Sequence, residues 1–179
     1  MSDNGAECTI SGTTLCAGEA SGQLLVLAEP LSFWGGTDRK TGLIIDTHHP
    51  QHGASLAGRV LLMDASRGSS SSSSVLAEQI RAGVGPAAIL LTARDVILAL
   101  GALAAAELYG THMPIVLLDS AGAALLRRED TPKRNSSSVL KIASLHVSVQ
   151  AGGDGNAVVA FPAHVAPGPA DPVTKRGTP

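Results

Sequence analysis

Apolar runs and helix-like segments alternate through the middle third of the chain. The runs predicted as strands are 59–63, 87–91 and 114–118, and the segments predicted as helices are 74–82 and 95–109. Strands that alternate with helices in this way are typical of a parallel sheet, because each helix carries the chain back across the sheet in a right-handed crossover. The pattern therefore predicts an α/β fold with a parallel βαβαβ core.

The first and last thirds add shorter strands that are separated by glycine and proline. Runs at 23–27 and 42–46 predict two strands, and the punctuation around them favours an antiparallel or mixed sheet. Beyond a short helix-like piece at 121–128, the runs at 146–149 and 157–161 flank a Gly-rich turn, which predicts a C-terminal β-hairpin. We therefore expect a mixed sheet built around the parallel core.

The chain has 179 residues, which is long enough for one domain with a hydrophobic core and short for two. We place this domain at residues 18–162, with a charged, Ser-rich surface insertion at 129–138. Residues 1–17 are polar and are expected to form a flexible N-terminus. The Pro-rich tail at 163–179 is expected to be disordered.

The overall charge and hydropathy exclude several classes of partner. A net charge of −2 and a pI of about 6.3 give no basis for binding nucleic acid or an anionic membrane surface. The longest apolar stretch, 96–108, is too short to cross a bilayer and is interrupted by Gly101 and Glu107. No secretory signal is visible at the N-terminus, so we expect a cytoplasmic protein with no nucleic acid or membrane partner.

Two groups of residues resemble metal ligands but do not predict a metal site. Cys8 and Cys16 are too few for a structural zinc or iron–sulfur site within the chain, and we expect both thiols to stay reduced. The cluster of Asp46, His48, His49 and His52 fits no established zinc spacing, and a turn at His49-Pro50 explains it more simply. Asp46 and His49 remain candidates for an active-site loop.

Two apolar features have simpler interpretations. The only tryptophan lies beside Phe33, and the Phe33-Trp34 pair is either a packing anchor or part of an inter-subunit contact, since aromatic residues concentrate at interfaces. The predicted helix 95–109 is so apolar that we expect it to be core.

A run of serines, Arg67-Gly68-Ser69 followed by serines to position 74, lies between the strand at 59–63 and the helix at 74–82. A strand, a glycine turn and a helix start place N–H donors and hydroxyls where they can bind an anion, and one serine can be held out as a reactive group. The alternative is a flexible low-complexity loop, since Ser-rich tracts are often linkers. The flanking periodicity favours the ordered turn.

Several segments together resemble the swivel domain, or small subunit, of the aconitase X family. They are 30–36, 42–50, 58–61, 67–70 and 106–110, and their order and spacing agree over roughly residues 18–162. The resemblance implies the swivelling β/β/α fold. It also implies a hydro-lyase made of two parts: a large part that carries an iron–sulfur cluster and most of the substrate pocket, and this small part, which closes over it. This chain alone would bind no metal.

The resemblance also assigns roles within the serine run. In the wider aconitase superfamily the base is a serine in a Gly-Ser-Ser-Arg loop, and Ser69 matches it by position. Dehydration needs such a base to take a proton. Arg67 is a plausible clamp for a carboxylate or phosphate, and Gly68, Ser70 and Ser71 are expected to contact substrate. Ser71 stands where the aconitase loop has its arginine, so Arg67 or the large part would have to bind the anion.

The substrate and even the class of function stay open at this point. Family activities include dehydration of cis-3-hydroxy-L-proline and of mevalonate 5-phosphate, and the small number of lysines favours the amino acid. The swivelling fold also serves as a phosphohistidine carrier domain, but the loop before the helix has serines where that function needs a histidine. A catalytically silent or regulatory subunit is a third possibility.

Overall fold

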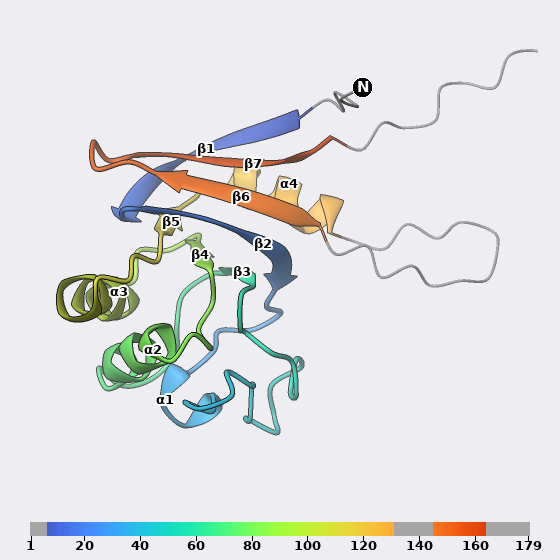
Figure 1. Cartoon of the computed structure of the whole chain (residues 1–179). Coiled ribbons are helices and arrows are strands. Elements are labelled where there is room, and N and C mark those ends of the chain that lie inside the picture. Colours follow the sequence, from blue (N-terminus) through green and yellow to red (C-terminus); the bar gives the residue numbers. More distant parts are fainter. Residues whose placement is uncertain (1–6, 131–144, 164–179) are drawn as a thin grey trace, which may run out of the picture.

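The computed structural model describes residues 7–130 and 145–163 of the chain (Figure 1). In chain order the elements are β1 (Glu7–Cys16), β2 (Gly18–Val26), α1 (Phe33–Gly36), β3 (Val60–Met63), α2 (Ser72–Arg81), β4 (Ala88–Leu91), α3 (Val96–Tyr109), β5 (Ile115–Leu117), α4 (Ser120–Glu129), β6 (His146–Ala151) and β7 (Asn156–Pro162). Most of the expected insertion and tail, at 131–138 and 164–179, lies outside the described residues.

The strands close into a barrel in the order β1-β5-β4-β3-β2-β6-β7. The four strands β2, β3, β4 and β5 are parallel to their neighbours in that order. The pairs β1–β5, β1–β7, β2–β6 and β6–β7 are antiparallel, and β6–β7 is the expected hairpin. The prediction of a mixed sheet with a parallel core and a C-terminal hairpin is confirmed. The sequence did not predict that this sheet closes into a barrel.

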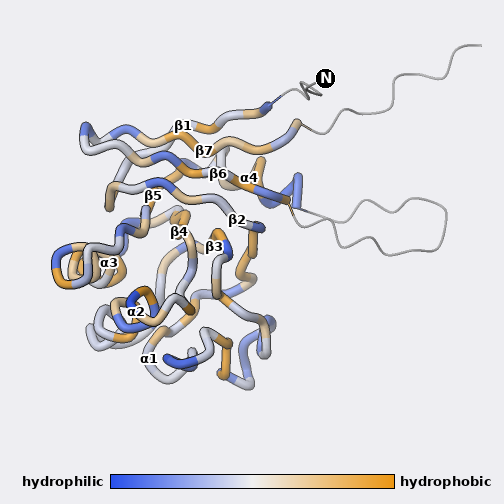
Figure 2. The backbone as a smooth tube through the Cα atoms, in the orientation of Figure 1, coloured by the Kyte–Doolittle hydropathy of each residue, from blue (hydrophilic) through white to orange (hydrophobic). Residues whose placement is uncertain are grey.

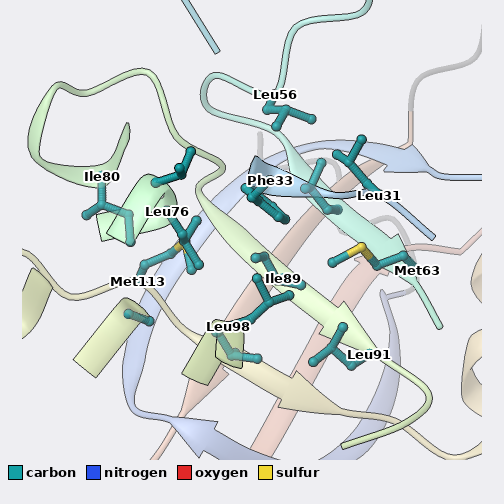
Figure 3. Close-up of a cluster of buried hydrophobic side chains, with 14 of the residues drawn as sticks. Leu31, Phe33, Leu56, Met63, Leu76, Ile80, Ile89, Leu91, Leu98 and Met113 are labelled. Carbon is teal, nitrogen blue, oxygen red and sulfur yellow. The ribbon is translucent and has the colours of Figure 1, made fainter. Parts of the chain in front are cut away.

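Strand periodicity separates two hydrophobic clusters on the two sides of the sheet. Along β3, Leu61 and Met63 join one cluster, whereas Val60 and Leu62 join the other. The first cluster lies under α2 and α3 and contains Phe33 and many leucines (Figure 3). Because both faces of the parallel strands are covered, β3 and β4 are apolar throughout, whereas β6 and β7 alternate (Figure 2).

Helices α1, α2 and α3 lie together on one side of the sheet (Figure 1). The contact between α2 and α3 is close at Gly101, where an added Cβ would be 2.7 Å from the carbonyl oxygen of Ser73. Glycine here lets α3 pack directly against the N-terminal turn of α2. Gly110, with φ of 65°, ends α3 in the left-handed conformation that glycine allows.

The prediction of a flexible N-terminus over residues 1–17 is wrong for residues 7–16. This segment is β1, which pairs with β7 from Glu7 to Thr13 and with β5 from Thr13 to Cys16. Its polar residues are the exposed half of an alternating strand, and its partners lie more than a hundred residues away in the sequence. Local pattern therefore gave no sign of the strand.

The predicted strand at 42–46 is also absent as a named strand. Leu43 and Ile44 form only isolated bridges, to Ser55 and Thr37. The backbone of this segment bonds to neighbouring loops: the N–H of Ile44 donates to Ala54 O at 2.9 Å. The apolar side chain of Ile44 is fully buried under this loop, which explains its strand-like sequence.

The prediction that helix 95–109 is simply core is only half right. Leu98, Gly101, Ala102 and Ala105 of α3 are buried. The opposite face is apolar and exposed, as Leu100 at 60% shows. None of the helices in the described part of the chain is both long and apolar enough to cross a membrane.

Candidate active site

The serine run lies at the carboxyl edge of the parallel strands. It follows β3 and leads into α2, which begins at Ser72. In open α/β sheets ligands bind at this edge, where loops from successive strands meet. Arg67, Gly68, Ser69 and Ser70 are exposed there. The predicted site residues Arg67, Gly68, Ser69 and Ser70 therefore lie at the edge of the sheet where ligands bind in such folds.

Hydrogen bonds within the run make it an ordered turn. The N–H of Ser71 donates to Ser69 Oγ at 3.2 Å, and the Ser69 hydroxyl in turn lies 3.4 Å from Ser71 Oγ. The carbonyl oxygen of Ser70 accepts from the Ser73 hydroxyl at 2.7 Å. Ser72 is buried, and its Oγ accepts from the N–H of Trp34 at 3.3 Å. The Ser69 hydroxyl is thus held at the helix start and remains open to solvent.

Gly68 allows the turn that presents Ser69. Its φ is +110°, a region that L-residues rarely adopt, and an added Cβ would lie 2.9 Å from Ser32 Oγ. That hydroxyl donates to the carbonyl of Trp34 at 2.6 Å, and the N–H of Arg67 donates to Leu31 O at 3.1 Å. The segment before α1 therefore supports the serine run from one side.

Asp46 and Arg67 come together across the site, a contact that the sequence did not reveal. Arg67 Nη2 lies 3.3 Å from Asp46 Oδ2, and the Asp46 side chain is 19% exposed. The N–H of His48 donates to Asp46 Oδ1 at 2.9 Å. That bond is the main cause of a lowered pKa for Asp46, and the nearby charge of Arg67 adds to it. Asp46 is therefore a carboxylate that orients the guanidinium.

Asp95 supports the run from the other side, and sequence reasoning missed it. One carboxylate oxygen accepts from the N–H and the hydroxyl of Ser66, and the other accepts from N–H groups of Ile97 and Leu98 at the start of α3. Burial would raise the pKa of Asp95, but these four bonds together lower it. An Asp before an apolar helical run is a typical N-cap, but its bond to Ser66 has no local signal.

His49 is buried within the loop that carries Asp46. It is 3% exposed, and both ring nitrogens are engaged by backbone groups. Nδ1 accepts from the N–H of Gln51 at 3.1 Å, and Nε2 lies 3.2 Å from Glu29 O. These bonds fold the loop that carries Asp46. His49 therefore positions the loop rather than facing a substrate.

Among residues 7–130 and 145–163, no group of three or more His, Cys, Asp or Glu side chains is arranged to hold a metal ion. The two thiols lie in different places: Cys16 belongs to the cluster under α2 and α3, and Cys8 packs on the other cluster. Burial raises the pKa of Cys16 to about 11, which keeps it protonated. The described side chains therefore do not fit an iron–sulfur cluster.

The two residues of the Phe33-Trp34 pair lie in different environments. Phe33 is fully buried in the cluster under α2, as a packing anchor (Figure 3). Trp34 is 56% exposed and lines a hollow of about 350 Å³ with Ile45 and Val75. Only Trp34 is available for a contact with another body.

Comparison with known proteins gives the family of this fold. A sequence model described as the aconitase X swivel domain matches residues 9–139, which is more than half of the chain. The chain belongs to the aconitase X swivel domain family. The Pseudomonas aeruginosa protein named cis-3-hydroxy-L-proline dehydratase is 53% identical to this swivel domain over 105 residues, which are 59% of this chain and 18% of that protein.

A second kind of relative and a solved structure agree with this assignment. The phosphomevalonate dehydratase small subunit of Methanothermobacter thermautotrophicus is 43% identical over 88 residues, which are 49% of this swivel domain and 67% of that subunit. The crystal structure of Thermococcus kodakaraensis aconitase X in its holo-form has a TM-score of 0.63 and 25% identity, covering 85% of this chain and 98% of that chain.

The two kinds of relative differ in how much of them this swivel domain represents. It spans 18% of the length of the cis-3-hydroxy-L-proline dehydratases of Pseudomonas aeruginosa and Hypocrea jecorina. More than four-fifths of each of those proteins therefore lies outside the match. It spans 67% of the length of the small subunit from Methanothermobacter thermautotrophicus.

Proposed function

We propose that this chain is the small part of a two-part hydro-lyase, in which Ser69 accepts the proton that the substrate loses on dehydration. The observation that carries the proposal is the exposed Ser69 hydroxyl, held by the Ser71 N–H at the start of α2 and at the carboxyl edge of the parallel strands.

The proposed substrate is cis-3-hydroxy-L-proline. Support comes from the relatives with that name, which are 53% and 43% identical to this chain. The second candidate is mevalonate 5-phosphate, because phosphomevalonate dehydratase small subunits are 34% to 43% identical. Both substrates carry an anionic group and a hydroxyl that leaves, so both need the same two functions from this chain: a base and an anion clamp.

Ser69 can act as a base only as an alkoxide, and the chain supplies part of the stabilisation. The N–H of Ser71 lies 3.2 Å from Ser69 Oγ and points a donor at the developing negative charge. The helix start contributes about 0.3 to 1 kcal/mol more. These contributions are too small to ionise a serine hydroxyl in water. The proposal therefore requires a partner protein that excludes water from the loop and adds positive charge.

Arg67 is proposed as the clamp for the carboxylate of the substrate. Its side chain is 56% exposed and contacts Asp46 through one nitrogen, so other N–H groups can form a bidentate pair with a carboxylate. Gly68, Ser70 and Ser71 are proposed to offer N–H and hydroxyl donors beside it. Asp46 orients the guanidinium, and His49 holds the loop of Asp46.

The partner in this proposal is the large part of an aconitase X enzyme, as a separate chain or a domain. It would hold the iron–sulfur cluster, because the described side chains of this chain do not fit one. A regulatory or carrier role is the alternative class of function. A phosphohistidine carrier is disfavoured because the turn before α2 contains serines and no histidine.

The test is reconstitution with the large part encoded in the same genome, followed by an assay for loss of water from each of the two substrates. Ser69→Ala is expected to lower kcat about 100- to 10,000-fold, as for removal of a general base. Ser74→Ala, also exposed and in the same run, is the matched control and should keep wild-type turnover. An active pair in which Ser69→Ala turns over normally would contradict the assignment of Ser69.

A further inference from the structure

Helix α3 is apolar on both of its faces, which is unusual for a helix at a surface. Glu107 is the only charged residue between Val96 and Tyr109. The outward face exposes Val96 at 71%, Leu100 at 60% and Leu108 at 70%. Surface helices normally carry polar residues on the outward face, and a helix that is apolar all round is normally buried on both sides. The outward face of α3 is therefore expected to be covered.

A hollow of about 380 Å³ continues this face as far as the serine run. Leu100, Ala104 and Leu108 form its α3 side, and Ser73 and Ser74 form part of its α2 side. The two serines directly follow the turn that presents Ser69. The exposed apolar surface and the candidate active site are therefore continuous.

A second apolar patch lies on the opposite side of the serine run. Trp34 is 56% exposed and Ile45 is 44% exposed, and both line the hollow of about 350 Å³ that also reaches Val75 of α2. Trp34 is tied to the run by its N–H, which donates to Ser72 Oγ. Apolar surface thus flanks the run on both sides.

Positive charge lies farther along α2. A third hollow, of about 360 Å³, is lined by Arg39, Lys40 and Arg81, with Glu78 as its acidic member. Glu78 is already engaged, since it accepts from Arg81 at 2.8 Å and from the Tyr109 hydroxyl at 3.0 Å. Arg81 and Glu78 balance each other, so the net positive charge of this hollow comes from Arg39 and Lys40.

We propose that the outward face of α3 and the Trp34 patch form one docking surface, on which the large part of the dehydratase sits. This inference rests on the proposed function, because that function supplies the occupant. We call these residues the docking face: Trp34, Ile45, Val96, Leu100, Leu103, Leu108 and Tyr109. The matching surface of the large part is expected to be apolar at its centre, with acidic side chains opposite Arg39 and Lys40.

Geometry favours the large part over a second copy of this chain. A partner that shields Ser69 from water must cover the serine run. Because the docking face borders that run on both sides, one partner can cover the outward face of α3, the serine run and the Trp34 patch together. A symmetric pair of swivel domains joined through this face would place the two serine runs against each other and close both to substrate. The relatives also point to a further part: one kind is named a small subunit, and in the other the match is 18% of the protein.

The first experiment measures binding of the purified full chain to the purified large part by titration calorimetry. The double variant Leu100→Glu, Leu108→Glu is expected to weaken the Kd at least 100-fold, because two charges would be buried against apolar surface. The matched control is Val158→Glu, which changes an exposed apolar residue of β7, at 43% exposure, outside the docking face. Circular dichroism of each variant alone verifies that the fold is intact.

The second experiment uses the only tryptophan in the chain. Chain labelled with 5-fluorotryptophan gives one fluorine resonance, from Trp34, which is expected to shift and broaden when unlabelled large part is added. A pair that binds and is active, but with an unchanged Trp34 resonance and an unchanged Kd for the double variant, would overturn the docking face and leave the proposed function intact. Failure of wild-type chain to bind the large part would overturn both.

Sedimentation of the chain alone tests whether a second copy of the chain covers the docking face. A monomer is expected at micromolar concentration. A dimer that the double variant dissociates, together with wild-type affinity of that variant for the large part, would assign the face to a second copy and contradict the inference.

Discussion

The carboxylate of Asp95 holds Ser66 by two hydrogen bonds, from the N–H at 2.8 Å and from the hydroxyl at 2.5 Å. Its second oxygen accepts from two N–H groups in the first turn of α3. Ser66 lies shortly before Ser69 in the same turn. Asp95 therefore connects the helix that carries most of the docking face with the loop that carries the proposed base.

Replacing Asp95 should affect both stability and catalysis. Asp95→Ala removes an N-cap and the two bonds to Ser66, so we expect a loss of about 2 kcal/mol in the free energy of unfolding, measured with urea. In the reconstituted enzyme we expect kcat to fall at least tenfold, because the loop that presents Ser69 loses its support.

The control for this prediction is Asp119→Ala. Asp119 caps α4 by accepting from the N–H of Gly122 at 2.7 Å, and it has no bond to the serine run. It should lose about 1 kcal/mol and keep wild-type kcat. Equal kcat values for the two variants would show that Asp95 has only a structural role.

Acid titration gives a second, independent test of Asp95. Its pKa in the folded chain is below the ordinary value of 3.8. A lowered pKa adds stability that is fully present above the unfolded pKa and is lost as the pH falls through the folded pKa. Asp95→Asn keeps a capping side chain but has no charge, so wild type should exceed it in stability at pH 7, and the difference should shrink below about pH 4. A difference that is constant from pH 7 to pH 3 would contradict this assignment.

The sequence predicted those parts of the fold whose signals are local. The strand β3 follows from a continuous apolar run and the helix α2 from the spacing of its apolar residues, so the serine run was correctly predicted to lie between a strand and a helix. The strand β1 was missed because its bonding partners are β5 and β7, far along the chain. A polar strand looks like a loop until its partners are known.

In the candidate site, too, the sequence shows local motifs but not the contacts between residues that are distant in the chain. Ser69 and Arg67 are candidates from their motif, whereas the hydrogen bonds between Ser66 and Asp95 and between Arg67 and Asp46 join residues that are distant in the sequence. The contacts of His49 with Glu29 O and the Gln51 N–H likewise come from the structure, because the sequence does not show which backbone groups lie beside its ring. Composition alone could not separate the buried and exposed faces of α3.

Replacing Gly68 should lower both the stability of the chain and the activity of the reconstituted enzyme. Gly68→Ala places a methyl group at φ of +110° and 2.9 Å from Ser32 Oγ, so the turn must move. We expect a loss of about 1 kcal/mol in stability and a fall of about 10- to 100-fold in kcat of the reconstituted enzyme.

Gly83→Ala is the matched control. Gly83 also has a positive φ, of +70°, but no atom lies within 4 Å of the added methyl, and it follows the opposite end of α2. It should lose similar stability and keep full kcat. If Gly68→Ala also keeps full kcat, the shape of this turn does not matter for catalysis.

The two cysteines should differ sharply in reactivity. Cys16 is 4% exposed and burial raises its pKa to about 11, so only about one thiol in a thousand is ionised at pH 8. Treatment of the folded chain with iodoacetamide should therefore add one label, at the half-exposed Cys8, and a second only in urea. Peptide mass spectrometry locates the labels, and Cys8→Ser should remain unlabelled while folded. Rapid labelling of Cys16 in the folded chain would contradict its buried position.

The pair of Asp46 and Arg67 should act on substrate binding rather than on the chemical step. Arg67→Lys keeps the charge but loses the fork that can hold a carboxylate through two hydrogen bonds, so we expect KM to rise about tenfold with a smaller change in kcat. Asp46→Asn should raise KM by a lesser factor, because the guanidinium loses the carboxylate 3.3 Å away that orients it.

A double-mutant cycle tests whether Asp46 acts through Arg67. If it does, Asp46→Asn should have little further effect on KM once Arg67 is lysine, so the two changes are not additive. His48→Ala keeps the backbone N–H that donates to Asp46 but removes an exposed imidazole whose Nδ1 lies 3.6 Å from Asp46 Oδ1, so it measures separately what that ring contributes. Fully additive changes in KM would mean that Asp46 contacts the substrate directly, and a large effect of His48→Ala would place that ring in the site as well.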